Sequence, residues 1–338
     1  MKVIIPVAGI GERLRPHTYL IPKALLMVAD KPILGHILEK IRDSIPKELE
    51  FTGIVFIVSY MKDKIKEYVN KNYNFNTIWV EQKERLGLGH AVWLTQKIVN
   101  EEPAFIVYGD TIFMIDEQKI KGLLNMKAGG ATSDGCLGVD EVEDPTRFGT
   151  VELKNGFVKK LVEKPLHPTT NLAIVGINFI QNTQLLFSCL EEMIAKNIKT
   201  RGRTSRGHTS KGEFQLTDAF QLMLGKGAKF KTFKVENWFD CGTPETLLNT
   251  NRKLLSRIQY SAPSIQDNDS SIKPPVFIHQ SAKIRHSIIG PYVSISRGAN
   301  IKNSIISDSI INQDAKVENL VLTHSIISAN NVNAKIKY

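Results

Sequence analysis

The N-terminal segment carries a glycine-rich turn, Gly9-Ile10-Gly11, directly after the short β-branched run Lys2–Val7. Because glycine has no side chain, backbone N–H groups in such a turn can approach phosphate oxygens closely. Cationic side chains follow within a few residues and can neutralise several phosphates together. This combination predicts a site for a polyphosphate, and its cations are Arg13, Arg15 and Lys23.

Two common phosphate-binding motifs do not fit this segment. A dinucleotide-binding fingerprint would need a third glycine where Leu14 stands. A P-loop would need a Gly-Lys-Ser/Thr run, which does not follow the turn. The specific feature is a longer array with fixed spacing, made of Gly9, Gly11, Arg13, Leu14, Pro16, Thr18, Pro22 and Lys23.

Two aspartates, Asp110 and Asp240, each follow an apolar run that has the character of a strand. In an open α/β sheet the carboxyl ends of the strands share one edge, and ligands bind outside that edge. We therefore expect both carboxylates to lie where a phosphorylated ligand would bind.

The elements that must position these residues alternate between strand and helix over the first ~255 residues. Apolar runs of four to eight residues between amphipathic helices indicate βαβ units and a largely parallel sheet. The predicted strands are Lys2–Val7, Ile54–Val58, Thr77–Val80 and Ala104–Tyr108, and the predicted helices are Pro32–Ile41, Lys62–Val69, His90–Val99, Glu213–Gly225 and Pro244–Leu255.

Two local signals are stronger than the rest. Asn155-Gly156 joins the runs Gly149–Leu153 and Phe157–Val162, and Asn-Gly supplies the positive φ angles of a type I′ hairpin turn. Thr243 before Pro244 is typical of a helix start, since threonine caps the helix and proline suits its first position.

The composition changes after Tyr260–Pro275, which is rich in serine, proline and aspartate and is typical of a linker. The octapeptide at Ala282 recurs, with substitutions, after 17 and then 16 residues, and Ala334 begins a further copy. Aliphatic residues return every five to six positions within each copy. This period predicts a β-helix of three to four coils, whose open end needs a cap or a partner subunit.

The overall composition excludes several classes of protein. The formal net charge of +10 implies an anionic partner, which a phosphorylated small molecule satisfies as well as a nucleic acid does. The apolar runs are far shorter than the ~20 residues that span a membrane, and we expect no signal peptide. Three scattered cysteines argue against a disulfide scaffold and favour a cytoplasmic location.

With these motifs the sequence resembles the sugar-1-phosphate nucleotidyltransferases, the NDP-sugar pyrophosphorylases. The array from Gly9 to Lys23 matches the family's Gly-x-Gly-Thr-Arg-Leu-x-Pro-x-Thr and Pro-Lys signature. Further segments match in order along residues 1 to ~255: Glu81-Gln82 with Leu86–Val92, Tyr108–Asp110, Phe148-Gly149, Glu163–Pro165, Val175-Gly176, Glu213–Asp218 and Trp238–Pro244. The likeness is greatest to glucose-1-phosphate thymidylyl- and uridylyltransferases, and members of the family often end in a left-handed β-helix.

The resemblance implies a fold and a set of roles. The fold is α/β, a Rossmann-like mixed, mostly parallel sheet with helices on both faces, followed by a small left-handed β-helix. Gln82 and Gly87 would read the base, and Mg²⁺ would be the cofactor. In full, the implied residues are Arg13, Lys23 and Lys164 for catalysis, Gly9, Gly11, Gln82, Gly87 and Gly109 for the nucleotide, Gly149, Glu163 and Gly176 for the sugar, and Asp110 and Asp240 for the metal.

The implied reaction joins an NTP to a sugar-1-phosphate and releases pyrophosphate. We expect dTTP or UTP as the nucleotide and glucose-1-phosphate as the sugar. Mannose-1-phosphate guanylyl transfer is an alternative, and so is a regulatory subunit that binds sugar nucleotides without turnover. The last reading is motivated by the self-stacking β-helix and by Glu12, which stands where the family usually has Thr or Ser and which we expect to turn outward.

The organisation predicted from these features has three parts: a catalytic domain over 1–258, a linker over 259–275 and a β-helix over 276–338. We expect the β-helix to assemble a homo-oligomer, and an acyltransferase role for it is a less favoured alternative. No nucleic acid or membrane partner is expected. The basic segment Asn197–Gly212 is either a solvated loop or a flap that closes over phosphates.

Overall fold

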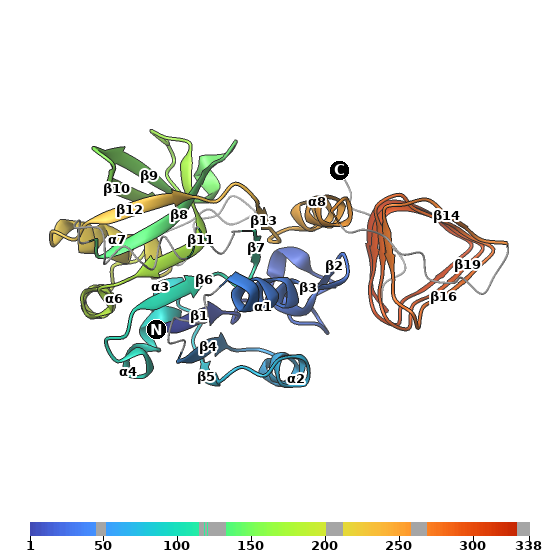
Figure 1. The fold of residues 1–338 in the computed structure, drawn as a ribbon, viewed down its shortest axis with the longest axis horizontal. Coiled ribbons are helices and arrows are strands. Elements are labelled where there is room, and N and C mark those ends of the chain that lie inside the picture. Colours follow the sequence, from blue (N-terminus) through green and yellow to red (C-terminus); the bar gives the residue numbers. More distant parts are fainter. Residues whose placement is uncertain are drawn as a thin grey trace. The chain divides into compact units, whose positions relative to one another are not determined.

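The computed structural model describes residues 1–44, 52–114, 118, 120, 133–200, 212–257 and 269–329. Its contacts divide the chain into two compact units (Figure 1). The first unit comprises Met1–Gly9, Glu39–Lys62 and Lys66–Trp238, and the second comprises Ile10–Leu38, Asp63–Ile65 and Phe239–Tyr338. Gly11, Arg13 and Lys23 are thus grouped with the C-terminal residues, whereas the sequence predicts one catalytic domain over 1–258.

The first unit is built on a mixed sheet in the order β10-β9-β11-β6-β1-β4-β5, with β8 and β12 joined through β11. Strand β1 pairs in parallel with β4 and β6, and β4 with β5. Every residue of β4 and β6 is buried, so both faces of this parallel core are covered. The parallel strands are β1 (Lys2–Pro6), β4 (Gly53–Val58), β5 (Thr77–Glu81) and β6 (Ala104–Val107).

Antiparallel strands extend the sheet beyond β6. The β9–β10 hairpin turns at Asn155 and Gly156, whose φ angles of 52° and 78° confirm the two positive angles that a type I′ turn requires. The remaining strands of this unit are β7 (Thr111–Phe113), β8 (Gly135–Glu141), β9 (Gly149–Lys154), β10 (Phe157–Glu163), β11 (Leu172–Ile180) and β12 (Phe230–Lys234), while β13 (Trp238–Asp240) leads into the second unit.

One apolar cluster joins the sheet to four helices, α3, α4, α6 and α7. It explains why the amphipathic segments of the sequence become helices, since each buries its apolar stripe against the strands. The helices of the chain are α1 (Ile33–Ser44), α2 (Lys62–Asn72), α3 (Leu88–Trp93), α4 (Gln96–Val99), α6 (Thr183–Ala195), α7 (Leu216–Gly225) and α8 (Pro244–Leu255).

Two helix predictions were wrong in their extent. The segment His90–Val99 breaks into α3 and α4, because the buried Thr95 hydroxyl bonds to Val92 O at 2.7 Å instead of facing solvent. Helix α7 begins at Leu216, since Glu213 pairs with Thr200 in an isolated β-bridge. The first departure comes from a side-chain hydrogen bond and the second from a long-range backbone pair. A hydrophobic pattern predicts neither.

Helix α8 belongs to the second unit and begins as predicted. The Thr243 side chain accepts from the N–H of Thr246, whose side chain accepts in return from the N–H of Thr243, and Pro244 takes the first position. Before it, the same unit holds the short helices η1 (Glu12–Leu14) and η2 (Lys23–Leu25) and the strands β2 (Met27–Val28) and β3 (Lys31–Pro32).

The C-terminal part of the second unit is a parallel β-helix, which confirms the repeat (Figure 1). Lys283 pairs with Asn300 and Asn300 with Lys316, which are the predicted steps of 17 and 16 residues. The coils stack Ile284, Ile301 and Val317 inward. The strands are β14 (Ser271–Ile272), β15 (Val276–Ile278), β16 (Lys283–Arg285), β17 (Ile288–Ile289), β18 (Val293–Ile295), β19 (Asn300–Lys302), β20 (Ile305–Ile311), β21 (Lys316–Glu318) and β22 (Val321–Ile327).

The α/β class with a C-terminal β-helix is therefore confirmed. Ala334, which begins the further repeat, and most of the predicted linker and basic loop lie outside the described residues. The predicted boundaries at 258 and 276 follow composition and stay a prediction.

Candidate active site

Gly11, Arg13 and Lys23 of the glycine and cation array lie in the second unit, and Gly11 is tightly packed from behind. Gly11 has a φ angle of +67°, and a Cβ atom there would lie 2.8 Å from Thr18 Cγ2 and 3.1 Å from Lys23 Cβ. The Thr18 hydroxyl donates to Gly11 O at 2.8 Å. Only glycine satisfies both the backbone angle and the space, so the array in the sequence has a structural cause.

Arg13 and Asp240 flank a cradle at Gly242 in the same unit. A Cβ atom on Gly242 would meet Asp240 Oδ1 at 2.8 Å and Arg13 Nη2 at 3.1 Å. The N–H of Gly242 donates to Asp240 Oδ1 at 2.8 Å and orients the carboxylate. A guanidinium and a carboxylate thus border one small space, an arrangement that suits a phosphate together with its cation.

The other charged residues of the array sit at its rim. Glu12 and Arg15 are exposed, and the Arg15 guanidinium lies 5.4 Å from the centre of the Tyr19 ring. Lys23 opens the short helix η2 and is half-buried. Glu12 therefore turns outward, as the sequence led us to expect.

Gln82 lies in the first unit and is almost completely buried. Its Nε2 atom is 3.0 Å from the carbonyl oxygen of Gly87 and 3.2 Å from Nδ1 of His90. A carbonyl only accepts, so the nitrogen of the amide must face it, and both amide protons then have acceptors. The acceptor oxygen of Gln82 makes no hydrogen bond with the described residues.

His90 fixes this orientation, a role that its position at a helix start does not suggest. Nδ1 must be unprotonated to accept from Gln82, which places the ring proton on Nε2. Burial lowers the pKa of His90, opposed only by the charge of Glu84, and so favours the neutral ring.

The loop before α3 approaches the backbone of Phe214 closely. Gly87 has a φ angle of +109°, and a Cβ atom there would lie 2.6 Å from Phe214 O. Gly89 donates its N–H to the same oxygen at 2.7 Å, and Phe214 donates to Leu86 O at 2.8 Å. The motif around Phe214 thus supports the predicted base-binding loop from behind.

The predicted sugar residues Gly149 and Glu163 are neighbours. The Thr217 hydroxyl donates to Glu163 Oε2 at 2.7 Å, and Lys164 Nζ lies 3.2 Å from Glu163 Oε1. A Cβ atom on Gly149 would lie 2.6 Å from the Thr217 hydroxyl and 3.0 Å from Glu163 Oε2. Gly149 therefore leaves the room in which this carboxylate is held.

Lys164 adopts a left-handed backbone with a φ angle of 44°, which is costly for a lysine. Its N–H donates to Phe148 O at 2.9 Å, so the strand end is held although the angle is unfavourable. The half-exposed side chain projects from this point beside Glu163.

Gly176 lies against the ring of Tyr108. Its φ angle is +81°, and a Cβ atom would lie 2.7 Å from Tyr108 Cδ2. Burial raises the pKa of Tyr108, and the nearby charges of Glu163 and Asp110 raise it further. Tyr108 therefore stays neutral and lies near both carboxylates, which links the predicted sugar and metal residues of this unit.

The remaining predicted residues lie near the end of β1 and β6. A Cβ atom on Gly109 would lie 2.5 Å from Val7 Cγ1 and 2.6 Å from Pro6 O, so glycine permits the close approach of the two strands. Gly9 is exposed and has no atom within 4 Å of its Cβ position, which leaves its backbone accessible. Asp110 follows β6 directly and accepts weakly from Thr111 at 3.4 Å.

The structure thus forms two groups. The first unit brings together Asp110, Gly149, Glu163, Lys164 and Gly176, with Gln82 and Gly87 around His90, and it also holds Gly9 and Gly109. The second unit brings together Gly11, Arg13, Lys23 and Asp240. Sequence reasoning assigned no role to Tyr108, His90 or Thr217. The matched motifs contained all three, and that membership was the only signal the sequence offered for them.

Asp218, next to Thr217, is a further buried carboxyl. Burial raises its pKa, and the hydrogen bond from Thr200 opposes that rise. The charge of Glu163 raises the pKa of Asp218 and that of Lys164 lowers it, so Asp218 lies near both side chains.

The described residues contain no group of three or more histidine, cysteine or acidic side chains that could hold a metal. Mg²⁺ does not need such a group, because it is bound through one or two carboxylates while phosphates and waters supply the other ligands. The oriented carboxylate of Asp240 beside the Gly242 cradle fits that use. Asp110 lies in the other unit, so the predicted pair stays a prediction.

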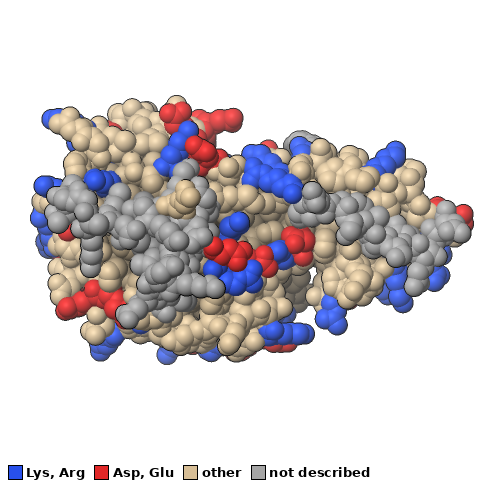
Figure 2. All heavy atoms as spheres, viewed as in Figure 1, with Lys and Arg blue, Asp and Glu red and all other residues tan. Residues whose placement is uncertain are grey.

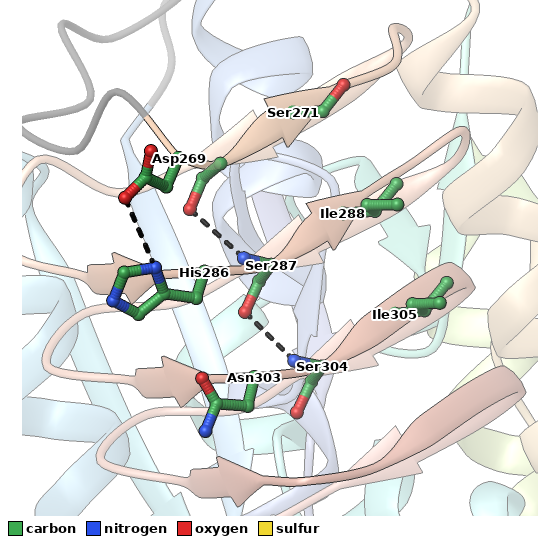
Figure 3. A pocket seen from close by; sticks show the side chains of 9 residues that line it. Asp269, Ser271, His286, Ser287, Ile288, Asn303, Ser304 and Ile305 are labelled. Carbon is green, nitrogen blue, oxygen red and sulfur yellow. Dashed lines mark hydrogen bonds and ion pairs between the residues drawn. The ribbon is translucent and has the colours of Figure 1, made fainter.

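A groove on the β-helix has a different character (Figure 3). Ser287 Oγ donates to Arg285 O at 2.7 Å and accepts from the N–H of Ser304 at 3.1 Å. Ser304 repeats the pattern toward Lys302 O. These hydroxyls therefore take part in the stacking of the coils. The acyltransferase alternative stays a prediction.

The charges on the face shown in Figure 2 alternate in sign, so the net charge of +10 does not form one broad basic patch on that face. Among the described residues, no helix has the length and apolarity needed to cross a membrane.

Comparison with known proteins gives consistent results. The family model described as "Nucleotidyl transferase" matches residues 2–257. A glucose-1-phosphate thymidylyltransferase of Streptomyces griseus is 28% identical, over 97% of this chain and 87% of the relative. The bifunctional protein GlmU of Methanococcus maripaludis is 32% identical over 84% of this chain, which spans only 62% of that relative.

A solved structure agrees with these relatives. It belongs to a Bacillus anthracis protein described as a glucose-1-phosphate thymidylyltransferase. It superposes with a TM-score of 0.61 and 25% identity, covering 78% of this chain and 98% of the other.

The contact between Gly176 and Tyr108 generates a stability prediction. Gly176→Ala should lower the free energy of unfolding in urea by more than Gly156→Ala, which has the similar φ angle of +78° but open space around it. Gly156→Ala should cost about 1–2 kcal/mol for the backbone angle alone. The clash with Tyr108 should add about 1–3 kcal/mol. Equal losses in the two variants would contradict the contact.

Proposed function

Because this chain belongs to the nucleotidyl transferase family, we propose that it transfers a nucleotidyl group from an NTP to a sugar-1-phosphate. A phosphate oxygen of the sugar-1-phosphate attacks the α-phosphorus of the NTP. A new P–O bond forms, the bond from the α-phosphorus to the bridging oxygen breaks, and pyrophosphate leaves with the electron pair. No covalent bond to the protein is required, so catalysis consists of positioning and charge neutralisation.

The observation that carries this proposal is the cradle at Gly242, bordered by Arg13 and Asp240 in the unit that also holds the Gly11 turn. In our proposal, Gly9 and Gly11 offer backbone N–H groups to the nucleotide. Arg13 neutralises the β- and γ-phosphates and then the leaving pyrophosphate. A cation at the leaving group stabilises charge that develops only as the bond breaks.

The remaining polar residues divide the other tasks. Lys23 would act at the reacting phosphates, and Lys164 would hold the sugar phosphate. Asp110 and Asp240 would hold Mg²⁺, which when bound supplies positive charge across the phosphate oxygens. Glu163 has a fixed orientation between Thr217 and Lys164, and this suits a carboxylate that accepts hydrogen bonds from sugar hydroxyls.

The orientation of Gln82 supports a preference among bases. With both amide protons engaged, Gln82 offers an acceptor and no donor. Uracil, thymine and guanine carry a ring N–H that such an acceptor can bind, whereas cytosine and adenine present an unprotonated ring nitrogen there. We therefore propose dTTP or UTP with glucose-1-phosphate, and GTP with mannose-1-phosphate as the alternative.

The regulatory-subunit alternative has less support. It rested on the self-stacking β-helix and on Glu12, and Glu12 is exposed. A cytoplasmic location remains a prediction from the sequence.

Pyrophosphate release tests the reaction itself. We expect release with Mg²⁺ for one or two pairs in a matrix of five NTPs and the 1-phosphates of glucose, mannose, galactose and N-acetylglucosamine. Asp110→Asn should reduce kcat at least about 100-fold if this carboxylate binds the metal ion, as loss of one strong electrostatic group does. Asp269→Asn, a change of the same kind on the exposed β-helix, is the matched control. Binding of an NTP without release from any pair would leave the regulatory alternative.

The base preference has its own test. The nucleotide preferred in the matrix, if it is UTP or dTTP, should lose at least about 10-fold in kcat/KM when its N3 position is methylated, since Gln82 would then face no donor. Gln82→Leu should lower kcat/KM for the unmodified nucleotide by a similar factor and abolish the discrimination against methylation. Full activity with the methylated nucleotide would rule out this mode of reading.

Assembly through the β-helix is a separate proposal. Ile305 and Val321 are 46% and 71% exposed and lie in register with Ile288, forming an apolar stripe across neighbouring strands. We propose that a second copy of this chain covers the stripe.

Light scattering should show Val321→Lys shifting the protein to a smaller species, while Gln313→Lys at an exposed turn should not. A wild-type mass equal to one chain would refute it.

A further inference from the structure

The β-helix contacts the phosphate-binding loop through a pair of residues 311 positions apart. His17 lies in that loop, between Arg13 and Lys23, and its Nδ1 atom is 3.0 Å from the hydroxyl of Ser328. Ser328 follows the last described strand of the β-helix, β22. Both residues belong to the second unit. An assembly role for the β-helix would not require this contact.

The direction of the hydrogen bond follows from a third residue. Asn312 Nδ2 donates to Ser328 Oγ at 3.0 Å, so the hydroxyl proton is directed to another acceptor. The unprotonated Nδ1 of a neutral imidazole is that acceptor. His17 is 5% exposed, and burial lowers its pKa to about 4, so the ring is neutral at pH 7. The chain Asn312 to Ser328 to His17 thus has a donor and an acceptor at each step.

His17 is directly coupled to the phosphate-binding turn. The next residue, Thr18, donates its hydroxyl to Gly11 O and packs its methyl group behind Gly11. The N–H of His17 itself donates to Leu14 O at 3.0 Å, in the short helix that carries Arg13. A shift of His17 would therefore move both the glycine turn and the arginine.

A second brace holds the other end of the same segment. Asn251 of α8 is completely buried, and its Oδ1 accepts from Ala29 N at 2.8 Å and from Ser294 Oγ at 2.6 Å. Its Nδ2 donates to Tyr292 O at 3.3 Å. The segment from Gly11 to Ala29 is thus tied to the β-helix at both ends, once directly and once through α8.

We propose that the β-helix positions the phosphate-binding loop, with Ser328 and His17 as positioning residues for the NTP. The proposal rests on the proposed function, because it assigns the NTP phosphates to this loop. Neither residue touches the reacting atoms. Their role is to hold the Gly11 turn and Arg13 in the arrangement that binds phosphate, since preorganised groups lose less freedom on binding.

The test uses the full-length protein and three variants. Ser328→Ala removes one hydroxyl, and Ser328→Thr restores it. Ser325→Ala is the control: Ser325 is buried in the last described coil, and its hydroxyl bonds within that coil to Thr323 O at 2.8 Å. Pyrophosphate release is measured against NTP and against sugar-1-phosphate, and amide hydrogen exchange is measured over residues 10–25 without ligand.

We expect Ser328→Ala to raise KM for the NTP about 3- to 10-fold, which is the loss of one hydrogen bond, and to leave KM for the sugar-1-phosphate within about twofold. Exchange over residues 10–25 should quicken by a similar factor. Ser328→Thr should return both values toward the wild type, and Ser325→Ala should change neither.

Three results would overturn the inference: unchanged KM and exchange in Ser328→Ala, equal changes in Ser325→Ala, or a rise in both KM values together. Failure of the proposed function would look different, because the wild type itself would then release no pyrophosphate from any pair. In that case hydrogen exchange alone decides whether the β-helix holds the loop.

Discussion

The buried amide of Asn251 is the junction on which the second unit depends. It lies on α8, accepts from Ala29 and Ser294 and donates to the backbone of Tyr292, so it joins the N-terminal segment to the β-helix. A fully buried amide is costly unless its hydrogen bonds are made, and these three partners are available together only when the segments are correctly placed. The capped helix α8 thereby connects a loop near the start of the chain to coils near its end.

Glycines shape the candidate site of the first unit, because their lack of a side chain lets other groups approach closely. Gly87 allows the backbone of Phe214 to approach, Gly149 leaves room for Glu163, and Gly176 admits the ring of Tyr108. In each case a Cβ atom would overlap a neighbour, so the glycines bring polar groups together that bulkier residues would separate. The close packing of Gly176 against Tyr108 is compatible with its predicted sugar contact, since this packing shapes the surface that a sugar would meet.

Several polar residues orient the side chains that are predicted to contact a substrate. His90 engages a proton of the Gln82 amide, so Gln82 presents an acceptor. Thr217 and Lys164 hold the two oxygens of Glu163. Ser328 holds His17 behind the Gly11 turn. In each pair a buried polar group has to find a partner, and that requirement orients a second group which a substrate would contact.

The sequence by itself determined the features that depend on neighbouring residues. The Asn155-Gly156 turn, the cap of α8, the β-helix repeat and the glycine and cation array are all readable locally, because turn angles, caps and close phosphate approach constrain residue type at fixed spacing. The tertiary structure alone decided the start of α7, the orientation of Gln82 and the tie between His17 and Ser328. These depend on which backbone or side chain lies opposite after folding, and partners up to 311 residues apart leave no periodic pattern in the chain.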